Sequence, residues 1–126
     1  MYIADIEITP PVLLAPLAGI TDLPFRRLGA GLVVSEMVAS QEVVQARPQA
    51  RSRAELGFDQ QATSVQLAGR EAFWMAEAAR HVEAQGAKVI DINMGCPAKK
   101  VTNGYSGSAL MKDPDHALRL IEAVVG

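Results

Sequence analysis

The stretch VIDINMGCPAKKV, residues 89–101, changes character at its centre. It starts as an apolar run of the kind that forms a buried strand, and it then breaks into Asn-Met-Gly-Cys-Pro. The break places Cys96, the chain's single cysteine, between Gly95 and Pro97. Because a proline fixes the backbone and a glycine permits close approach, we interpret this stretch as a strand that ends in a loop of defined conformation.

This strand is the last of four, and a helical pattern follows each of them. The expected strands are residues 11–19, 32–37, 63–69 and 88–93. The expected helices are residues 21–31, the two polar stretches 40–46 and 48–56, and then residues 70–86 and 113–125. The third helical region, 70–86, has apolar residues at helical spacing, which predicts a buried face of Ala72, Met75, Ala76, Ala79 and Val82.

Capping residues mark the expected helix ends. Thr21 or Asp22 is expected to cap the first helix, and Asp113 to cap the last one, which has Pro114 in its first turn. Glycines commonly end helices, so the first helix is expected to stop at Gly29 or Gly31 and helix 70–86 at Gly86.

Strands that alternate with helices form a parallel sheet, because each crossover helix returns the chain to the same end. A doubly wound sheet ranks second, because the segment PLAGITD after the first strand lacks the G-x-G-x-x-G spacing of a dinucleotide site. A closed (β/α)8 barrel needs about 250 residues. We therefore predict an α/β fold that is the truncated N-terminal half of a TIM barrel, with residues 1–126 as an incomplete catalytic domain.

The composition is that of an ordinary globular segment. The 126 residues are 49% hydrophobic and 21% charged, and the net charge is −2. A lone cysteine makes no internal disulfide, which favours a reducing, cytoplasmic location. No run approaches the roughly 20 apolar residues of a membrane span, and the N-terminus lacks the basic start of a signal peptide. We expect no membrane partner, and the sequence singles out no metal site.

Cys96 is the first candidate for chemistry. In barrels of this type the active site lies at the carboxyl ends of the strands, and Cys96 follows such an end directly. A buried structural thiol is the alternative, since cysteine is among the most buried residue types. The flanking Gly95 and Pro97 favour a reactive thiol at the mouth of the barrel.

Several segments together resemble the tRNA-dihydrouridine synthases, especially their bacterial B-type branch. In chain order they are APLAGITDLPFR, SEM, VQLAG, DINMGCPAKKV and GSALM. The resemblance runs over nearly the whole chain and implies an enzyme that binds FMN and uses NADPH to reduce the C5=C6 bond of particular uridines in tRNA. It also implies that the second half of the barrel and the helical tRNA-binding domain are missing, so we expect this chain to be inactive or incomplete.

The resemblance implies roles for the positions that match its motifs. Cys96 corresponds to the residue that donates a proton to C5 of uracil. A free thiol has a pKa of about 8.5, so it is mostly protonated at neutral pH and is still a better acid than a hydroxyl. Gln66 corresponds to a glutamine that hydrogen-bonds the flavin. The remaining cofactor contact is the backbone that lies against the ring, formed by Pro16, Leu17 and Ala18.

Substrate contacts are implied at two further positions. Asn93 corresponds to a residue near flavin and substrate, and an asparagine that caps its own loop is the alternative. Lys100, together with Lys99, would suit a nearby tRNA phosphate, and a solvated loop is the alternative.

Two other functional hypotheses stay open. The chain is alternatively a non-catalytic half-barrel remnant, or it belongs to another class of flavin-barrel oxidoreductase of the dihydroorotate dehydrogenase kind. The first crossover, TDLPFRRLGAGLVV, is also about one helical turn shorter than the family leads us to expect. The sequence indicates neither the target uridine nor the oligomeric state.

Overall fold

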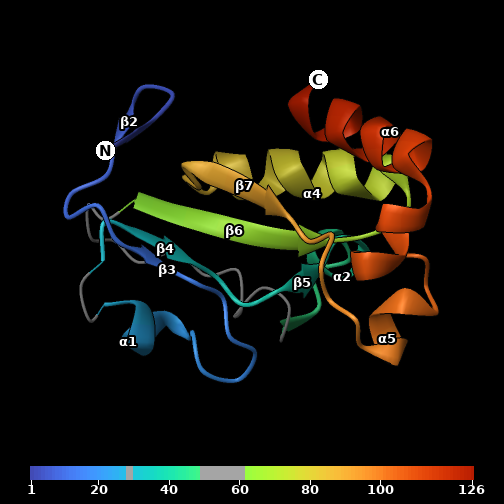
Figure 1. Cartoon of the computed structure of the whole chain (residues 1–126), viewed down its shortest axis with the longest axis horizontal. Coiled ribbons are helices and arrows are strands. Elements are labelled where there is room, and N and C mark those ends of the chain that lie inside the picture. Colours follow the sequence, from blue (N-terminus) through green and yellow to red (C-terminus); the bar gives the residue numbers. More distant parts are fainter. Residues whose placement is uncertain (28–29, 49–61) are drawn as a thin grey trace.

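The computed structural model of the chain describes residues 1–27, 30–48 and 62–126 (Figure 1). Its main sheet has five parallel strands in these residues. Four of them pair in chain order: β3 Leu13–Leu14, β4 Leu32–Val34, β6 Ala62–Ala68 and β7 Val89–Ile92. A doubly wound sheet places later strands on the other side of the first one, whereas a barrel adds each strand beside the previous one. The order therefore agrees with the predicted half-barrel.

The second predicted strand, residues 32–37, forms only over residues 32–34 as β4, and another short strand follows just beyond its predicted end. β4 pairs with the first half of β6, and β5 Val38–Ala39 pairs with the last two residues of the same strand. Because β7 occupies the opposite edge of β6, both pieces lie along one edge. Ser35 bridges the gap: its backbone N–H donates to Ser64 O at 2.9 Å, and its Oγ accepts from Gln66 N at 3.1 Å.

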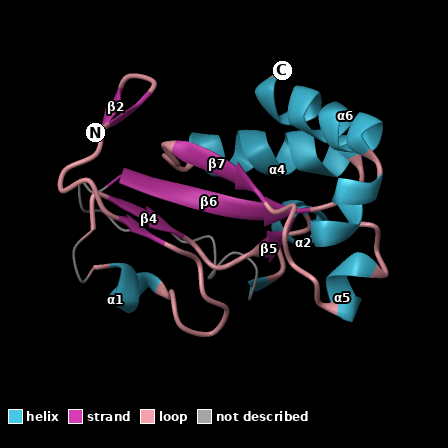
Figure 2. Cartoon of the chain, viewed as in Figure 1, coloured by secondary structure: helices cyan, strands magenta, loops and turns pink. Residues whose placement is uncertain are grey.

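Helices cover one face of the sheet (Figure 2). α4 Ala72–Ala84 packs between α2 Ser40–Val44 and α6 Pro114–Val125, and it also contacts β6. Side chains from these elements and from the 3₁₀ helix η1 Gly107–Lys112 form the core: Val38, Val43, Val65, Leu67, Met75, Ala78, Ala79, Val82, Leu110 and Leu120. The predicted face of α4 is confirmed at Met75, Ala79 and Val82. It is wrong at Ala72, which lies exposed in the first turn. Ala78, which was not part of the predicted face, is also buried.

Two predicted helix caps are confirmed. Asp22 accepts a hydrogen bond from Phe25 N at 3.0 Å at the start of α1 Leu23–Arg26, and Asp113 accepts one from His116 N at 3.0 Å at the start of α6. Gly86 follows the end of α4 with φ +102, a conformation that only glycine adopts without strain.

The end of the first helix was predicted wrongly. α1 stops at Arg26, before either predicted glycine. Gly29 lies outside the described residues, as do residues 49–56 of the predicted helical stretch 48–56. Gly31 has a packing role instead, because a Cβ there would lie 1.9 Å from the carbonyl oxygen of Pro10. The described part of the first crossover thus contains one helical turn, and Gly31 near its end packs directly on the N-terminal segment.

The N-terminal part of the chain differs from the prediction in two respects. β1 Tyr2–Ile3 and β2 Ile6–Glu7 form an antiparallel hairpin that the sequence pattern did not indicate. The first barrel strand, expected to be buried over residues 11–19, is reduced to β3, and Leu13 is 52% exposed. β3 pairs on one edge only, so its apolar residues remain partly open to solvent.

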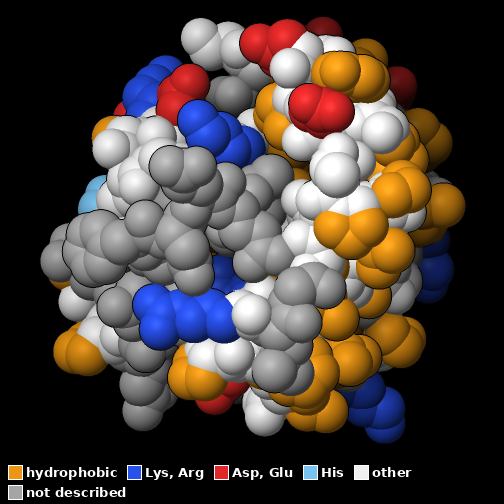
Figure 3. All heavy atoms as spheres, turned by 90° about the vertical axis from the view of Figure 1, so that its left-hand side faces the viewer, with side chains coloured by type: hydrophobic (Ala, Val, Ile, Leu, Met, Phe, Trp, Pro, Cys, Tyr) orange, Lys and Arg blue, Asp and Glu red, His pale blue; other side chains and the backbone are white. Residues whose placement is uncertain are grey.

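Hydrophobic side chains also gather along one side of the face that Figure 3 shows, at the N-terminal end of the sheet. The exposed large hydrophobic residues before and within β3 are Met1, Tyr2, Ile3, Val12 and Leu13, whereas Leu17 and Ile20 lie in the loop at the carboxyl end of β3. Parallel sheets in proteins normally have both faces covered. In the described residues, helices cover one face, and the opposite face is the one that would line the interior of a barrel.

Replacing Gly31 by alanine should lower the free energy of unfolding by about 1–3 kcal/mol, because the added methyl group overlaps the Pro10 carbonyl and forces the backbone apart. Thermal unfolding followed by circular dichroism measures the effect. Gly95→Ala is the matched control, since a Cβ at Gly95 meets nothing within 4 Å. Equal stability of the two variants would contradict the predicted packing of the first crossover.

Candidate active site at the carboxyl ends of the strands

The residues after β3, β5, β6 and β7 all lie at the same end of the parallel sheet. This is the end at which (β/α) barrels carry their active sites. Three of the predicted side-chain positions, Gln66, Asn93 and Cys96, are connected there by hydrogen bonds. The chain of hydrogen bonds ends at a carboxylate that sequence reasoning did not single out, that of Asp91, which accepts from Gln66.

Gln66 and Asp91 are register partners on β6 and β7, so their side chains leave the sheet on the same face. The Nε2 group of Gln66 donates a hydrogen bond to a carboxylate oxygen of Asp91. Gln66 Oε1 accepts a hydrogen bond from Asn93 Nδ2 at 3.1 Å. Gln66 is buried, and these two hydrogen bonds give each end of its amide a partner within the protein.

Asn93 caps the loop that carries the cysteine. Its Oδ1 accepts a hydrogen bond from the backbone N–H of Cys96 at 3.0 Å, and its own N–H donates to Leu67 O at 2.9 Å. The loop-capping alternative for Asn93 is thus the role visible in the structure. One hydrogen of its amide group is not used by these bonds and is available to a ligand.

The GSALM segment supports Cys96 from the other side. The backbone N–H of Ser108 donates to Cys96 O at 3.0 Å. Gly107 has φ +59, and a Cβ there would lie 2.6 Å from Cys96 O. Cys96 itself is half-buried with a free thiol. Gly107 was not predicted to have a role, although its place in a segment that resembles the family was a signal.

The loop of Pro16, Leu17 and Ala18 is fixed by two neighbouring side chains. Thr21, fully buried, accepts from Leu17 N at 3.0 Å and donates to Leu17 O at 3.2 Å, so it closes this loop and does not cap α1. The Glu36 carboxylate accepts a hydrogen bond from Gly19 N. Ala18 and Leu17 are exposed and Pro16 is half-buried, which leaves the backbone of the segment accessible.

The loop and the Asp91-to-Cys96 chain are separate units. Among the residues that the structure describes, no hydrogen bond joins Pro16, Leu17 or Ala18 to Gln66, Asn93 or Cys96. They share only the same end of the sheet.

The predicted phosphate contacts lie at the start of α5 Lys99–Thr102. The Lys99 side chain is exposed, which is compatible with a contact to RNA and equally with a solvated loop. The side chain of Lys100 lies outside the described part of the chain.

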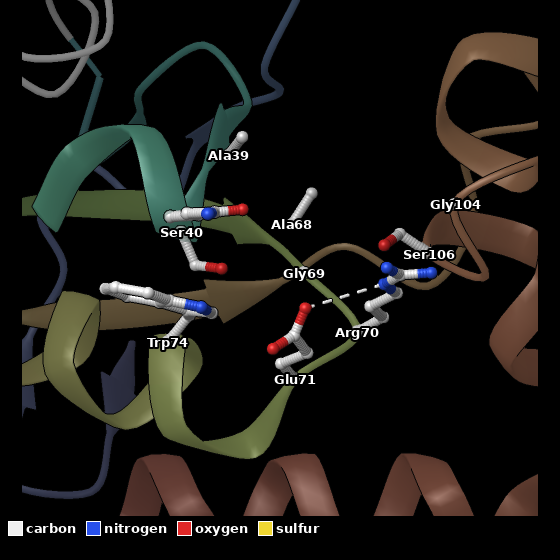
Figure 4. A pocket seen from close by; sticks show the side chains of 10 residues that line it. Ala39, Ser40, Ala68, Gly69, Arg70, Glu71, Trp74, Gly104 and Ser106 are labelled. Carbon is white, nitrogen blue, oxygen red and sulfur yellow. Dashed lines mark ion pairs between the residues drawn. The ribbon is translucent and has the colours of Figure 1, made fainter. Parts of the chain in front are cut away.

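A pocket of about 180 Å³ lies beside this site (Figure 4). It is formed by the end of β6 and the starts of α2 and α4, and its lining includes Ser40, Trp74 and Ser106. Arg70 and Glu71 form an ion pair in its wall, with 3.7 Å between Arg70 Nε and Glu71 Oε1. The pocket does not include any of the predicted site residues.

Residues 1–27, 30–48 and 62–126 contain neither a cluster of metal-ligating side chains nor a membrane-spanning helix. No group of three or more His, Cys, Asp or Glu side chains there is arranged to hold a metal ion. No helix in these ranges has the length and apolar character needed to cross a membrane.

A parallel half-barrel whose polar side chains converge at the carboxyl end of the sheet is typical of (β/α) barrel enzymes. The chain belongs to the dihydrouridine synthase family, whose model, described as "Dihydrouridine synthase (Dus)", matches residues 13–126. This finding confirms the resemblance and the fold class, and it favours the dihydrouridine synthases over the dihydroorotate dehydrogenase alternative.

Curated relatives agree with the family match. The chain is 67% identical to a "Probable tRNA-dihydrouridine synthase" of Rhodobacter capsulatus, over 97% of this chain and 39% of that protein. It is 63% identical to a protein of the same name from Rhizobium leguminosarum, over 90% of this chain and 37% of that protein. It is 50% identical to "tRNA-dihydrouridine synthase B" of Xanthomonas campestris, over 99% of this chain and 39% of that protein. The chain thus spans about two fifths of the length of these relatives.

Replacing Gly107 by alanine should displace the Cys96 loop, because the added methyl group overlaps Cys96 O and the residue has a positive φ. We expect faster alkylation of Cys96 by iodoacetamide and a loss of about 1–3 kcal/mol in unfolding free energy. Gly104→Ala is the control, since a Cβ at Gly104 makes only an ordinary contact at 3.4 Å. An unchanged alkylation rate in Gly107→Ala would show that η1 does not hold the cysteine loop.

Proposed function

We propose that this chain is the N-terminal part of the FMN-binding barrel domain of a tRNA-dihydrouridine synthase, an oxidoreductase that uses NADPH to reduce the C5=C6 bond of specific uridines in tRNA. The observation that carries the proposal is the coincidence of the family match with a cysteine loop held at the carboxyl end of the sheet. Because tRNA is the proposed substrate, we also propose that the protein acts in the cytoplasm. Residues 1–126 would contribute the first half of the barrel.

The residues present are suited to FMN. Gln66 and Asn93 each retain one amide hydrogen beyond those that the protein uses, and the polar edge of a flavin ring carries carbonyl oxygens that accept such bonds. Leu17 and Ala18 are exposed and Pro16 is half-buried, so this segment is accessible to the ring. We propose that Gln66 and the segment of Pro16, Leu17 and Ala18 contact the cofactor, which when bound would supply the hydride for C6 of uracil after its own reduction by NADPH. The remaining amide hydrogen of Asn93 is left for the substrate.

Cys96 is the proposed proton donor. Reduction of the double bond requires a hydride at C6 and a proton at C5, and the thiol supplies the proton from the face opposite the hydride donor. The Cys96 S–H bond breaks, a C5–H bond forms, and the resulting thiolate regains a proton from solvent. Asn93 and Ser108 hold the backbone of Cys96 on both sides, so the position of the sulfur is set before substrate arrives.

The substrate must leave the folded tRNA to reach this site. Extruding a nucleotide costs a few kcal/mol, which contacts to the RNA backbone offset. We propose that Lys99 and Lys100 at the start of α5 contribute to such contacts through a phosphate group. Asn93 would contact the extruded base through its remaining amide hydrogen.

A chimera tests the proposal: this chain replaces the matching segment of the Rhodobacter capsulatus relative, which supplies the remaining length. The chimera should form dihydrouridine in tRNA. Cys96→Ala should reduce that step by about 10²–10⁴-fold, the usual contribution of a general acid, while NADPH still reduces the bound flavin at a similar rate. Stopped-flow absorbance separates the two half-reactions.

Cys96→Ser is the conservative control. A hydroxyl of similar size is a much weaker acid, so we expect little recovery of the tRNA-dependent step. Equal losses in both half-reactions would instead indicate a structural cysteine, because they would follow the folded fraction. Reoxidation by tRNA at the wild-type rate in Cys96→Ala would refute the proton-donor role. A wild-type chimera that forms no dihydrouridine would favour the non-catalytic alternative.

A further inference from the structure

Asp91 is a charged residue on the interior face of the sheet that the proposed reaction does not use. It is half-buried near the end of β7, and its side chain lies on the same face as that of Gln66. In the described part of the chain, no Lys or Arg forms an ion pair with it. Its carboxylate has one hydrogen-bond partner there, Gln66 Nε2. Taking a charge out of water is costly, so a charge in this position calls for an explanation.

The carboxylate determines which way the Gln66 amide faces. The two ends of an amide are nearly equal in shape but opposite in polarity, and a carboxylate only accepts hydrogen bonds. The NH2 end of Gln66 must therefore face Asp91. The flipped amide would place Oε1 against the carboxylate, which brings two acceptors together in a buried site and leaves both without a donor.

The orientation of the Gln66 amide also determines that of Asn93, which caps the cysteine loop. With its NH2 end toward Asp91, Gln66 offers Oε1 to Asn93, so Asn93 must turn its own NH2 group toward Gln66. That turn directs Asn93 Oδ1 to the backbone N–H of Cys96. The charge of Asp91 thus selects one orientation for two consecutive amides, and the second amide anchors Cys96.

We propose that Asp91 is a positioning residue that orients Gln66 and, through Asn93, holds the backbone of Cys96. The geometric part of this inference depends only on this chain, and its consequence for catalysis rests on the proposed function. The arrangement also sets what the site offers to a ligand, because the unused hydrogen of each amide makes Gln66 and Asn93 donors. The site should therefore bind a ligand edge that carries acceptors, such as ring carbonyl oxygens.

Nuclear magnetic resonance of the ¹⁵N-labelled 126-residue chain tests the geometric part. In the wild type, the Gln66 side-chain amide should give one pair of signals with slow hydrogen exchange. Asp91→Leu removes the acceptor, so we expect exchange at Gln66 to become faster by about tenfold or more, as for the loss of a hydrogen bond to a charged group. The Asn93 side-chain signals should change with it.

Asp91→Asn keeps the shape of the side chain and covers the case in which Asp91→Leu does not fold. Its own amide can accept from Gln66 or donate to it, so both orientations of Gln66 become possible and we expect two sets of Gln66 signals. Glu83→Gln, an exposed change of the same kind on α4, is the control and should leave these signals unchanged. A folded Asp91→Asn variant with wild-type Gln66 and Asn93 signals and exchange rates would overturn the proposal.

A double-mutant cycle in the chimera tests the catalytic consequence. Asp91→Asn should lower kcat/KM for tRNA by about 10- to 100-fold, the scale of a small misplacement of reacting groups. If Asp91 acts through Gln66, Asp91→Asn should have little further effect in a Gln66→Ala background, whereas independent effects would multiply. Multiplying effects would overturn the proposal. An inactive wild-type chimera would count against the proposed function alone, because the resonance experiment still decides the geometry.

Discussion

The pairing of β6 on both of its edges is the constraint on which the rest of the structure depends. β6 is the longest strand, and its alternating side chains serve two different environments. Val65 and Leu67 are fully buried against the helices, while Ser64 and Gln66 lie on the interior face. A shift of one residue in the register would exchange these two sets and bury a glutamine among Met75, Val82 and Leu120. The hydrophobic core thus fixes the register, and the register fixes the place of Gln66.

Hydrogen bonds from side chains, rather than strand pairing, hold the loops in place relative to the sheet. Ser35 replaces one strand pairing at the break between β4 and β5, Thr21 closes the loop after β3, and Asn93 closes the loop after β7. Each such bond contributes only about 0.5–1.5 kcal/mol to stability. Their larger effect is on geometry, because each ties a loop residue to a strand whose position is already determined by packing.

Sequence reasoning predicted the elements whose causes are local. The helix caps Asp22 and Asp113 act within three residues, and the apolar spacing of α4 lies within one segment. The loop around Cys96 was recognisable for the same reason, since Gly95 and Pro97 adjoin it. The exposure of Leu13 was not predictable in this way, because an apolar run looks the same in a central strand and in an edge strand.

The contacts around the candidate site that sequence reasoning missed join residues far apart in the chain. In the sequence, Asp91 is only a polar residue within an apolar strand. The register of β6 and β7 places it opposite Gln66, 25 positions earlier. In the sequence, Gly107 is only the start of a segment of small residues. The structure shows that it packs against the carbonyl oxygen of Cys96. Such pairs depend on register and loop path, which no local pattern specifies. It follows that changes on the helix-facing side of β6 should affect the site only through the folded fraction. Changes on its interior side alter the site's geometry directly, because Gln66 and Asp91 connect the sheet to the cysteine loop.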